Sequence, residues 1–160
     1  MQWTAQDNRD HDGQLFPPEP ASTSLVWDST VEGGGQFGTD AQTSGLIVGH
    51  TTPYNREKLG VFQGLRLVAP GDYAAITTVN GRLCYKVTLV DTSIRKDSYR
   101  MVDGKRLYEV DEKYRYAPPR PGIIYLVACY RLDDGNNGPT TNNIVVVLEL
   151  DQSVTNAGSC

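Results

Sequence analysis

Residues 123–130 read Ile-Ile-Tyr-Leu-Val-Ala-Cys-Tyr, and residues 144–150 read Ile-Val-Val-Val-Leu-Glu-Leu. Both stretches are short, apolar and rich in β-branched and aromatic residues, which predicts two strong β-strands. The segment between them, from Asp133 to Pro139, is rich in Gly, Asn and Asp, and it predicts a turn. This pair of strands decides the fold, because it places the centre of a sheet near the end of the chain.

Further strands are predicted upstream of this pair. Residues 23–27 have strand-like composition, and residues 46–48 form an apolar run bounded by glycines that ends at His50. Asn80-Gly81 is the preferred pair for a type I′ turn, and it predicts a hairpin between residues 73–79 and 82–90. In its second strand, Leu83, Tyr85, Val87 and Leu89 share one face. Residues 55–65 indicate one or two short helical turns.

A long irregular connection is expected from Asp91 to Gly122, and it holds eight of the fifteen Lys and Arg residues. A connection of this length inside a compact domain is usually functional. The non-functional interpretation is a solvated loop of mixed charge, because the same segment also contains six Asp and Glu residues. With little helix and no internal repeat, the fold class expected is all-β, as a closed barrel with one or two short helices.

Composition excludes several classes of function. The 160 residues suit one domain, and a formal net charge of −4 gives no basic field for nucleic acid. No segment reaches the apolar length of a membrane span, and the first residues do not resemble a secretory signal. Three cysteines, an odd number, argue against a disulfide framework. No CxxC or HExxH pair is present, so no metal and no cofactor is expected.

If the protein uses nucleophilic catalysis through a cysteine and a histidine, the candidates are few, because the chain has three cysteines and two histidines. Cys129 lies in the apolar strand and His50 ends another, whereas His11 lies in the polar N-terminal arm and Cys160 in the tail. A thiolate nucleophile needs a partner that stabilises it or moves its proton, and His is the usual one. Taken alone, a cysteine in a buried strand is usually a small hydrophobic residue, and a histidine after a strand is usually structural.

Four segments together resemble the sortase family of bacterial cysteine transpeptidases. They are Leu46-Ile47-Val48-Gly49-His50-Thr51, Phe62-Gln63-Gly64-Leu65 with Pro70-Gly71-Asp72-Tyr73, Gly81-Arg82-Leu83-Cys84-Tyr85-Lys86-Val87, and Tyr125-Leu126-Val127-Ala128-Cys129. The resemblance covers about Leu25 to Leu150 and implies a β-barrel of about eight strands. It divides the chain into a polar Pro-containing arm (1–21), a sortase-like catalytic barrel (22–152) and a polar tail (153–160). It also implies that Cys129 and His50 are catalytic.

The sequence departs from the family at the start of the last strand, where the family has an Arg and this chain has Asn142 and Asn143. An amide donates to a developing oxyanion without bringing a charge, and charge-assisted bonds are roughly twice as strong. Arg131 is a substitute donor, on the face of Cys129 if the strand continues. The long connection corresponds to the family's substrate-selecting loop, in which the candidate substrate-binding residues are Val102, Leu107, Tyr108, Tyr114 and Arg120.

The resemblance implies a cysteine transpeptidase. It would cleave a short sorting motif of the Leu-Pro-x-Thr-Gly type through a thioacyl-enzyme and transfer the product to an amine, with hydrolysis as a side reaction. The alternative is a weakened or inactive sortase-fold module that serves in binding or structure, since Asn replaces the Arg. A third class, the L,D-transpeptidases, is disfavoured because their Ser-His-Gly-Cys pattern is absent. A plain binding barrel with an inert cysteine is the least specific alternative.

The partners implied are a peptide or protein bearing the sorting motif and an amine nucleophile, such as a cell-wall peptide or a pilin lysine. No nucleic acid and no membrane span of this chain are expected. Family resemblance places the protein at the extracellular face of a bacterial envelope. No signal or anchor is visible in the sequence, which fits a shortened chain or a phage-encoded form.

Overall fold

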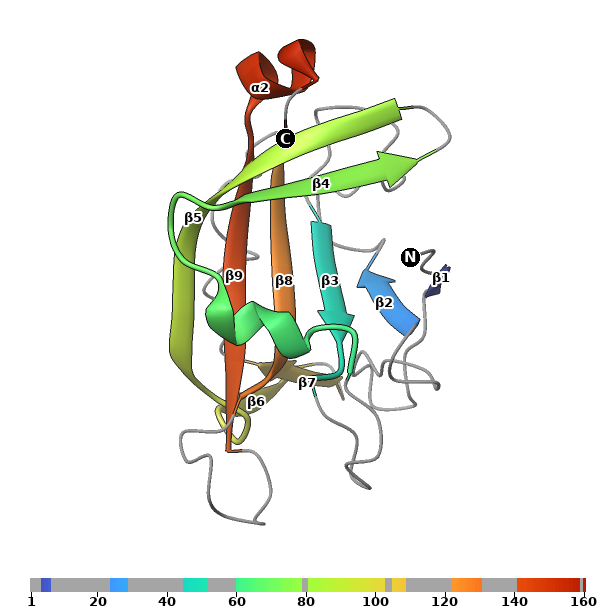
Figure 1. Ribbon diagram of the computed structural model, residues 1–160. Coiled ribbons are helices and arrows are strands. Elements are labelled where there is room, and N and C mark those ends of the chain that lie inside the picture. Colours follow the sequence, from blue (N-terminus) through green and yellow to red (C-terminus); the bar gives the residue numbers. More distant parts are fainter. Residues whose placement is uncertain are drawn as a thin grey trace.

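The computed structural model describes residues 4–6, 24–28, 45–51, 60–78, 81–102, 105–108, 122–130, 141–158 and 160. The strands are β1 (Thr4–Gln6), β2 (Ser24–Asp28), β3 (Gly45–Gly49), β4 (Tyr73–Thr78), β5 (Gly81–Arg95), β6 (Tyr99–Val102), β7 (Lys105–Tyr108), β8 (Ile123–Tyr130) and β9 (Asn142–Leu150). Two short helical elements accompany them, the 3₁₀-helix η1 (Gln63–Leu67) and the α-helix α2 (Gln152–Ala157). The all-β prediction is confirmed (Figure 1).

Seven strands form one curled sheet in the order β1-β2-β3-β8-β9-β5-β4, while β6 and β7 pair separately (Figure 1). β8 lies between parallel β3 and antiparallel β9. The sheet curves as a half-barrel, and its order among the described strands ends at β1 and β4. The described strands include no pairing between β1 and β4, so the expected closure of the barrel is not seen among them.

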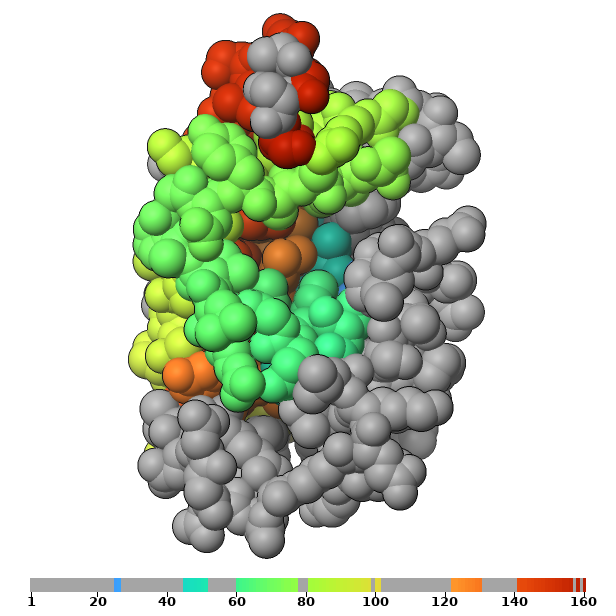
Figure 2. All heavy atoms as spheres, viewed as in Figure 1, coloured from blue at the N-terminus to red at the C-terminus, as the bar shows by residue number. Residues whose placement is uncertain are grey.

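The central strands bury both faces, which explains their uninterrupted apolar sequences. On one face, Ile124 and Ala128 of β8 pack with Val146 of β9 and Leu65 of η1. η1 crosses this face in front of β8 and β9 (Figure 1). Figure 2 shows the same face hollowed between β4 and the 60–67 segment, with β8 and β9 visible at the base. On the opposite face, a second cluster joins Val127, Val145 and Ile94.

β5 runs to Arg95, five residues beyond the predicted end at Val90. Its pairing with β9 is irregular between Val87 and Leu89 and again between Asp91 and Ile94. The first irregularity changes the alternation of faces, so Leu89 is 40% exposed although it was expected on the face of Tyr85 and Val87. The second lets Ile94 turn inward, where it is 2% exposed. The two bulges therefore explain why a period-two pattern does not predict the last five residues of β5.

Two hairpins lie at Asn-Gly and Asp-Gly pairs of the sequence, although in the first of them Gly81 already pairs within β5. The predicted β4–β5 hairpin is present, but Thr78 pairs with Gly81, so the strands meet one residue earlier than expected. Gly81 has φ 133°, a conformation that favours glycine. The connection expected to be irregular contains β6 and β7, in which Val102 pairs with Lys105 around Asp103-Gly104. An Asp-Gly pair between two strands is itself a hairpin signal.

The end of the chain is fastened to the sheet, and the expectation of no disulfide is wrong. Cys84, 1% exposed on β5, is bonded to Cys160. Asp151 caps α2 by accepting hydrogen bonds from the amides of Ser153 and Val154, and Gly158 ends the helix at φ 66°. The odd cysteine count misled because one thiol, Cys129, is left over from a real pair.

Of the one or two helical turns expected in residues 55–65, η1 at residues 63–67 overlaps the last three positions, and residues 55–59 lie outside the described residues. Leu65 is buried and Phe62 packs against the same core, as their spacing predicted. Among the residues that the structure describes, no helix is long and apolar enough to cross a membrane.

Candidate functional site

His50 and Cys129 are brought to the same level by the parallel pairing of β3 with β8. Gly45 pairs with Ile124 and Gly49 with Ala128, a constant offset of 79 (124 − 45). His50 and Cys129 are separated by the same 79 positions (129 − 50), so His50, immediately after β3, follows the register to Cys129. Neighbouring strands lie about 4.8 Å apart, which makes the two residues lateral neighbours.

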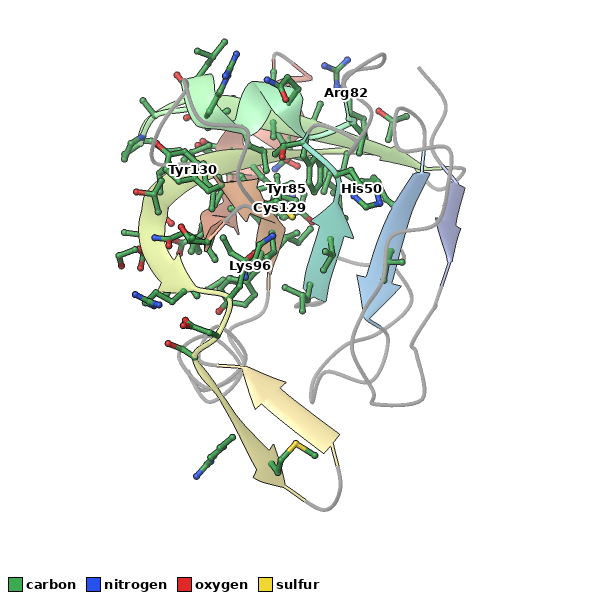
Figure 3. The ribbon with its side chains drawn as sticks, turned by 90° about the horizontal axis from the view of Figure 1, so that it is seen from below. His50, Arg82, Tyr85, Lys96, Cys129 and Tyr130 are labelled. Carbon is green, nitrogen blue, oxygen red and sulfur yellow. A yellow bond between two sulfur atoms is a disulfide. The ribbon has the colours of Figure 1, made fainter. Side chains whose placement is uncertain are left out.

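Cys129 lies on the sheet face opposite η1. Its neighbours Ala128 and Val127 belong to opposite core clusters, and alternation puts Cys129 on the side of Val127. Asn143 of β9 pairs directly with Cys129 and therefore shares that face. Figure 3 shows Cys129 with His50 to one side and Lys96 to the other. Both Cys129 and His50 are partly exposed, as a reacting group must be.

The backbone that follows β3 is held at this position by three short contacts. The Thr51 hydroxyl donates to the Cys129 carbonyl at 2.9 Å. The Phe62 amide donates to the His50 carbonyl at 2.8 Å, and the Gly60 amide donates to the Thr51 carbonyl at 2.6 Å. A Cβ added to Gly60 would lie 2.2 Å from the His50 oxygen, so only glycine permits this approach. These contacts fix the backbone of His50 relative to Cys129.

A lysine that the sequence analysis did not single out contacts the cysteine. The Lys96 ammonium donates to Cys129 Sγ at 2.9 Å. Its backbone amide donates to the Thr141 carbonyl, which extends the β5–β9 ladder one step past the pair of Arg95 and Asn142. Lys96 therefore lies on the face of Ile94 and Asn143.

The charged residues next to Lys96 in the sequence pair with each other. Arg95 forms a two-point contact with Asp97, at 2.8 and 2.6 Å, on the exposed surface. These hydrogen bonds, together with the attraction of the opposite charges, lower the pKa of Asp97 and raise that of Arg95. Asp97 is thus engaged by Arg95 at the turn where Lys96 reaches toward the sulfur.

The structure separates the two asparagines that were expected to share one role. Asn142, 7% exposed, lies on the other face from Cys129, and its amide donates to the Thr92 carbonyl at 2.9 Å. Asn143 lies opposite Cys129. Of the expected substrate-binding residues, Val102 lies in β6, and Leu107 and Tyr108 lie in β7. Tyr114, Arg120 and Arg131 lie outside the described residues.

The β6–β7 hairpin lies at the end of the sheet where β3 and β8 finish (Figure 1). Seen from below, it projects on the side of Lys96 (Figure 3). The β6–β7 hairpin, which belongs to the expected substrate loop, thus lies at the end of the sheet that carries Cys129. Among the described residues, no group of three or more His, Cys, Asp or Glu side chains is placed to hold a metal ion.

Fold and site together define an all-β protein in which a cysteine and a histidine lie side by side at the ends of paired parallel strands. Searches against family models and curated proteins gave no match. Solved sortase structures do match: sortase A from Corynebacterium diphtheriae (TM-score 0.54, 17% identity) and sortase C-1 from Actinomyces oris (TM-score 0.52, 14% identity). A pilus-related sortase C of Group B Streptococcus matches with a TM-score of 0.53 and 15% identity.

The chain therefore has a sortase-like fold, as the sequence resemblance implied. The alignments cover 81–84% of this chain but 48%, 59% and 56% of the three sortases, respectively. The chain thus spans about half the length of these structures. At such identities the likeness concerns the fold.

Proposed function

We propose that the protein is a cysteine transpeptidase of the sortase type, with Cys129 as the nucleophile and His50 as the acid and base. The observation that carries this proposal is the shared register of the two residues across β3 and β8, reinforced by the Thr51 bond to the Cys129 carbonyl. A thiolate beside an imidazole is the arrangement that thiol-dependent acyl transfer requires.

The reaction proposed has two steps. Cys129 Sγ forms a bond to the carbonyl carbon of a scissile peptide, and the carbonyl electron pair moves to oxygen. When the carbonyl re-forms, the carbon–nitrogen bond breaks and the leaving amine takes a proton from His50. An incoming amine then attacks the thioacyl carbon and gives a proton to His50, which releases the Cys129 thiolate and a new amide. Water in place of the amine gives hydrolysis.

The substrate proposed is a short sorting motif of the Leu-Pro-x-Thr-Gly type. Val48 and Val127 belong to one apolar cluster, and each lies two residues before His50 or Cys129 on the same face; this apolar neighbourhood suits the apolar part of such a motif. Val102, Leu107 and Tyr108 belong to the adjacent hairpin, and Tyr114, Arg120 and Arg131 stay candidates from the sequence. The acceptor proposed is the amine of a cell-wall peptide or of a pilin lysine.

The disulfide supports a location outside the cytoplasm. Stable disulfides form in oxidising compartments and are rare in the cytosol. The Cys84–Cys160 bond therefore favours the extracellular face of a bacterial envelope.

A second candidate function has its own observation. The start of the last strand, where the family has Arg, holds Asn142 and Asn143 in this chain, and the Asn142 amide is occupied by the Thr92 carbonyl. A site without a strong oxyanion donor suits a sortase-fold module that binds the motif without turning it over.

Incubation with a panel of sorting-motif peptides and an amine separates the two functions. The transpeptidase predicts an amide product, measured by liquid chromatography and mass spectrometry, that is lost in Cys129→Ala and in His50→Gln. Peptide binding without product in the native protein, across the panel and at several amine concentrations, would favour the binding module and contradict the transpeptidase.

A further inference from the structure

The contact between Lys96 and Cys129 spans a strand. β5 and β8 are not neighbours, because β9 lies between them. Two strand spacings amount to about 10 Å. Only a long side chain crosses that distance, and the Lys96 side chain reaches across β9, on the face that also carries Asn143, to place its ammonium 2.9 Å from Cys129 Sγ. The cation therefore reaches the nucleophile from the strand beyond the one that bears Asn143.

The chemistry of the contact indicates the form of the sulfur that it favours. An ammonium group has donors and no acceptor, so Cys129 Sγ must be the acceptor. A thiolate is the stronger acceptor, and a nearby cation favours it electrostatically. Among the described strands, the charged or imidazole groups on this face near the Cys129 end are His50 after β3 and Asp91 of β5, which accepts hydrogen bonds from the Ser93 amide and hydroxyl. At this end β9 contributes the uncharged Asn143, whereas Glu149, Lys86 and Arg82 share the face toward the other end of β9 and β5.

We infer that Lys96 supplies the cation of this site. It stabilises negative charge on Cys129 Sγ before attack and on the carbonyl oxygen beside Sγ afterwards. The role at the carbonyl oxygen rests on the proposed function, whereas the role at Cys129 Sγ does not. As Sγ bonds to the carbonyl carbon, the charge leaves sulfur for oxygen, and the ammonium passes its hydrogen bond from one to the other. Lys96 keeps its proton throughout, and His50 moves the protons. The position of the cation, at the end of β5, compensates for Asn143 at the start of β9.

The first test needs no substrate. Cys129 is the free thiol of the three cysteines, so iodoacetamide modifies it alone while the Cys84–Cys160 bond is intact. Iodoacetamide is neutral, so a lysine does not attract it. The readout is the alkylation rate at pH 7 divided by that at pH 10, which follows the thiolate fraction. Lys96→Met, which keeps the stem and removes the charge, is expected to lower this ratio about tenfold.

Two variants control for structure. Lys96→Arg keeps the charge and is expected to restore the ratio to within about threefold of the native protein. Arg95→Met removes a neighbouring cation that pairs with Asp97 rather than with the sulfur, and it is expected to leave the ratio unchanged. A ratio for Lys96→Met within twofold of native, in a variant with native circular dichroism and melting temperature, would overturn the inference.

The second test uses the peptide reaction. Lys96→Met is expected to lower kcat/KM at least tenfold, and Lys96→Arg to recover most of it. If the native protein turns over no peptide, the proposed function fails, while the alkylation ratio still decides the role of Lys96 at the thiol. Acyl transfer onto the Lys96 amine, located by fragmentation of the modified peptide, would overturn the inference by making Lys96 an acceptor rather than a charge.

Discussion

Removal of the Cys84–Cys160 disulfide is expected to destabilise the protein without disturbing the Cys129 site. The bond joins β5 to the last residue of the chain, and its sequence separation of 76 closes nearly half of the molecule into a loop. In Figure 1 the C-terminus and α2 lie at one end of the sheet, whereas β3 and β8 finish at the other. Stability and thiol reactivity should therefore respond separately.

The magnitude follows from loop closure. For a separation of 76 the chain-entropy relation gives about 15 cal/mol/K, or about 4.5 kcal/mol at 25 °C. Native disulfides commonly contribute about 2–4 kcal/mol. Other contacts stay after reduction, because the Thr155 hydroxyl accepts from the Cys84 amide at 2.9 Å and Tyr73 donates to Asp151 at 2.9 Å. We therefore expect a loss of about 2–4 kcal/mol in the free energy of unfolding.

The assay is urea unfolding of the native protein with and without a phosphine reductant, beside Cys160→Ser. Cys160→Ser removes the cross-link and leaves the buried Cys84 side chain in place. Reduction of the native protein and the substitution should lower the unfolding free energy equally, and reduction should not affect Cys160→Ser. A loss below 0.5 kcal/mol in both, measured well outside the error of extrapolation, would refute the loop-closure reasoning.

Three further predictions concern the anchors of the site and the C-terminal helix. Gly60→Ala should lower peptide turnover at least tenfold, because its Cβ meets the His50 carbonyl, whereas Gly64→Ala, which meets nothing within 4 Å, should not; equal activities would contradict this account. Thr51→Val should cost about 1 kcal/mol of unfolding free energy in a urea titration, with Thr51→Ser close to native, because the hydroxyl holds the Cys129 carbonyl. Hydrogen bonds from Ser153, Val154 and Tyr73 lower the pKa of Asp151 to about 2. The contribution of Asp151 to stability is therefore full above pH about 4 and is lost as the pH falls toward 2. In an acid titration, the unfolding free energy of Asp151→Asn should lack this part of the decline that the native protein shows.

The central strands were predictable because their signal is local. β8 has the bounds that the sequence predicted, and β9 starts two residues early, at the polar Asn142 and Asn143 that no apolar pattern includes. The predicted end of β5, at Val90, was too early. Two bulges interrupt the alternation of buried and exposed side chains, first after Val87 and again after Asp91, so the rest of the strand shows no period-two pattern. Apolar runs predict strands, whereas a bulge depends on the partner strand.

The site could be predicted only in part for the same reason. Cys129 and His50 were singled out from the sequence because Cys129 lies in one apolar strand and His50 ends another, and the resemblance to sortases joined them. Lys96 was counted only as one base in a mixed loop. Its signal was the alternation of Ile94 and Lys96 beyond the apparent end of β5, and its contact with Cys129 needs β9 between the two strands. The disulfide was missed because counting cysteines does not show which two meet.

The intact mass of the protein after brief exposure to a sorting-motif peptide, without an amine, shows whether Cys129 is the nucleophile. If it is, the mass increases by that of the N-terminal part of the motif; the added mass is located on Cys129 by fragmentation, is removed by hydroxylamine, and is absent from Cys129→Ala. The adduct should accumulate more slowly in Lys96→Met than in the native protein or in Lys96→Arg, in parallel with the lower alkylation ratio expected for Lys96→Met. Peptide turnover with no adduct on Cys129, or the same product from Cys129→Ala, would contradict the account.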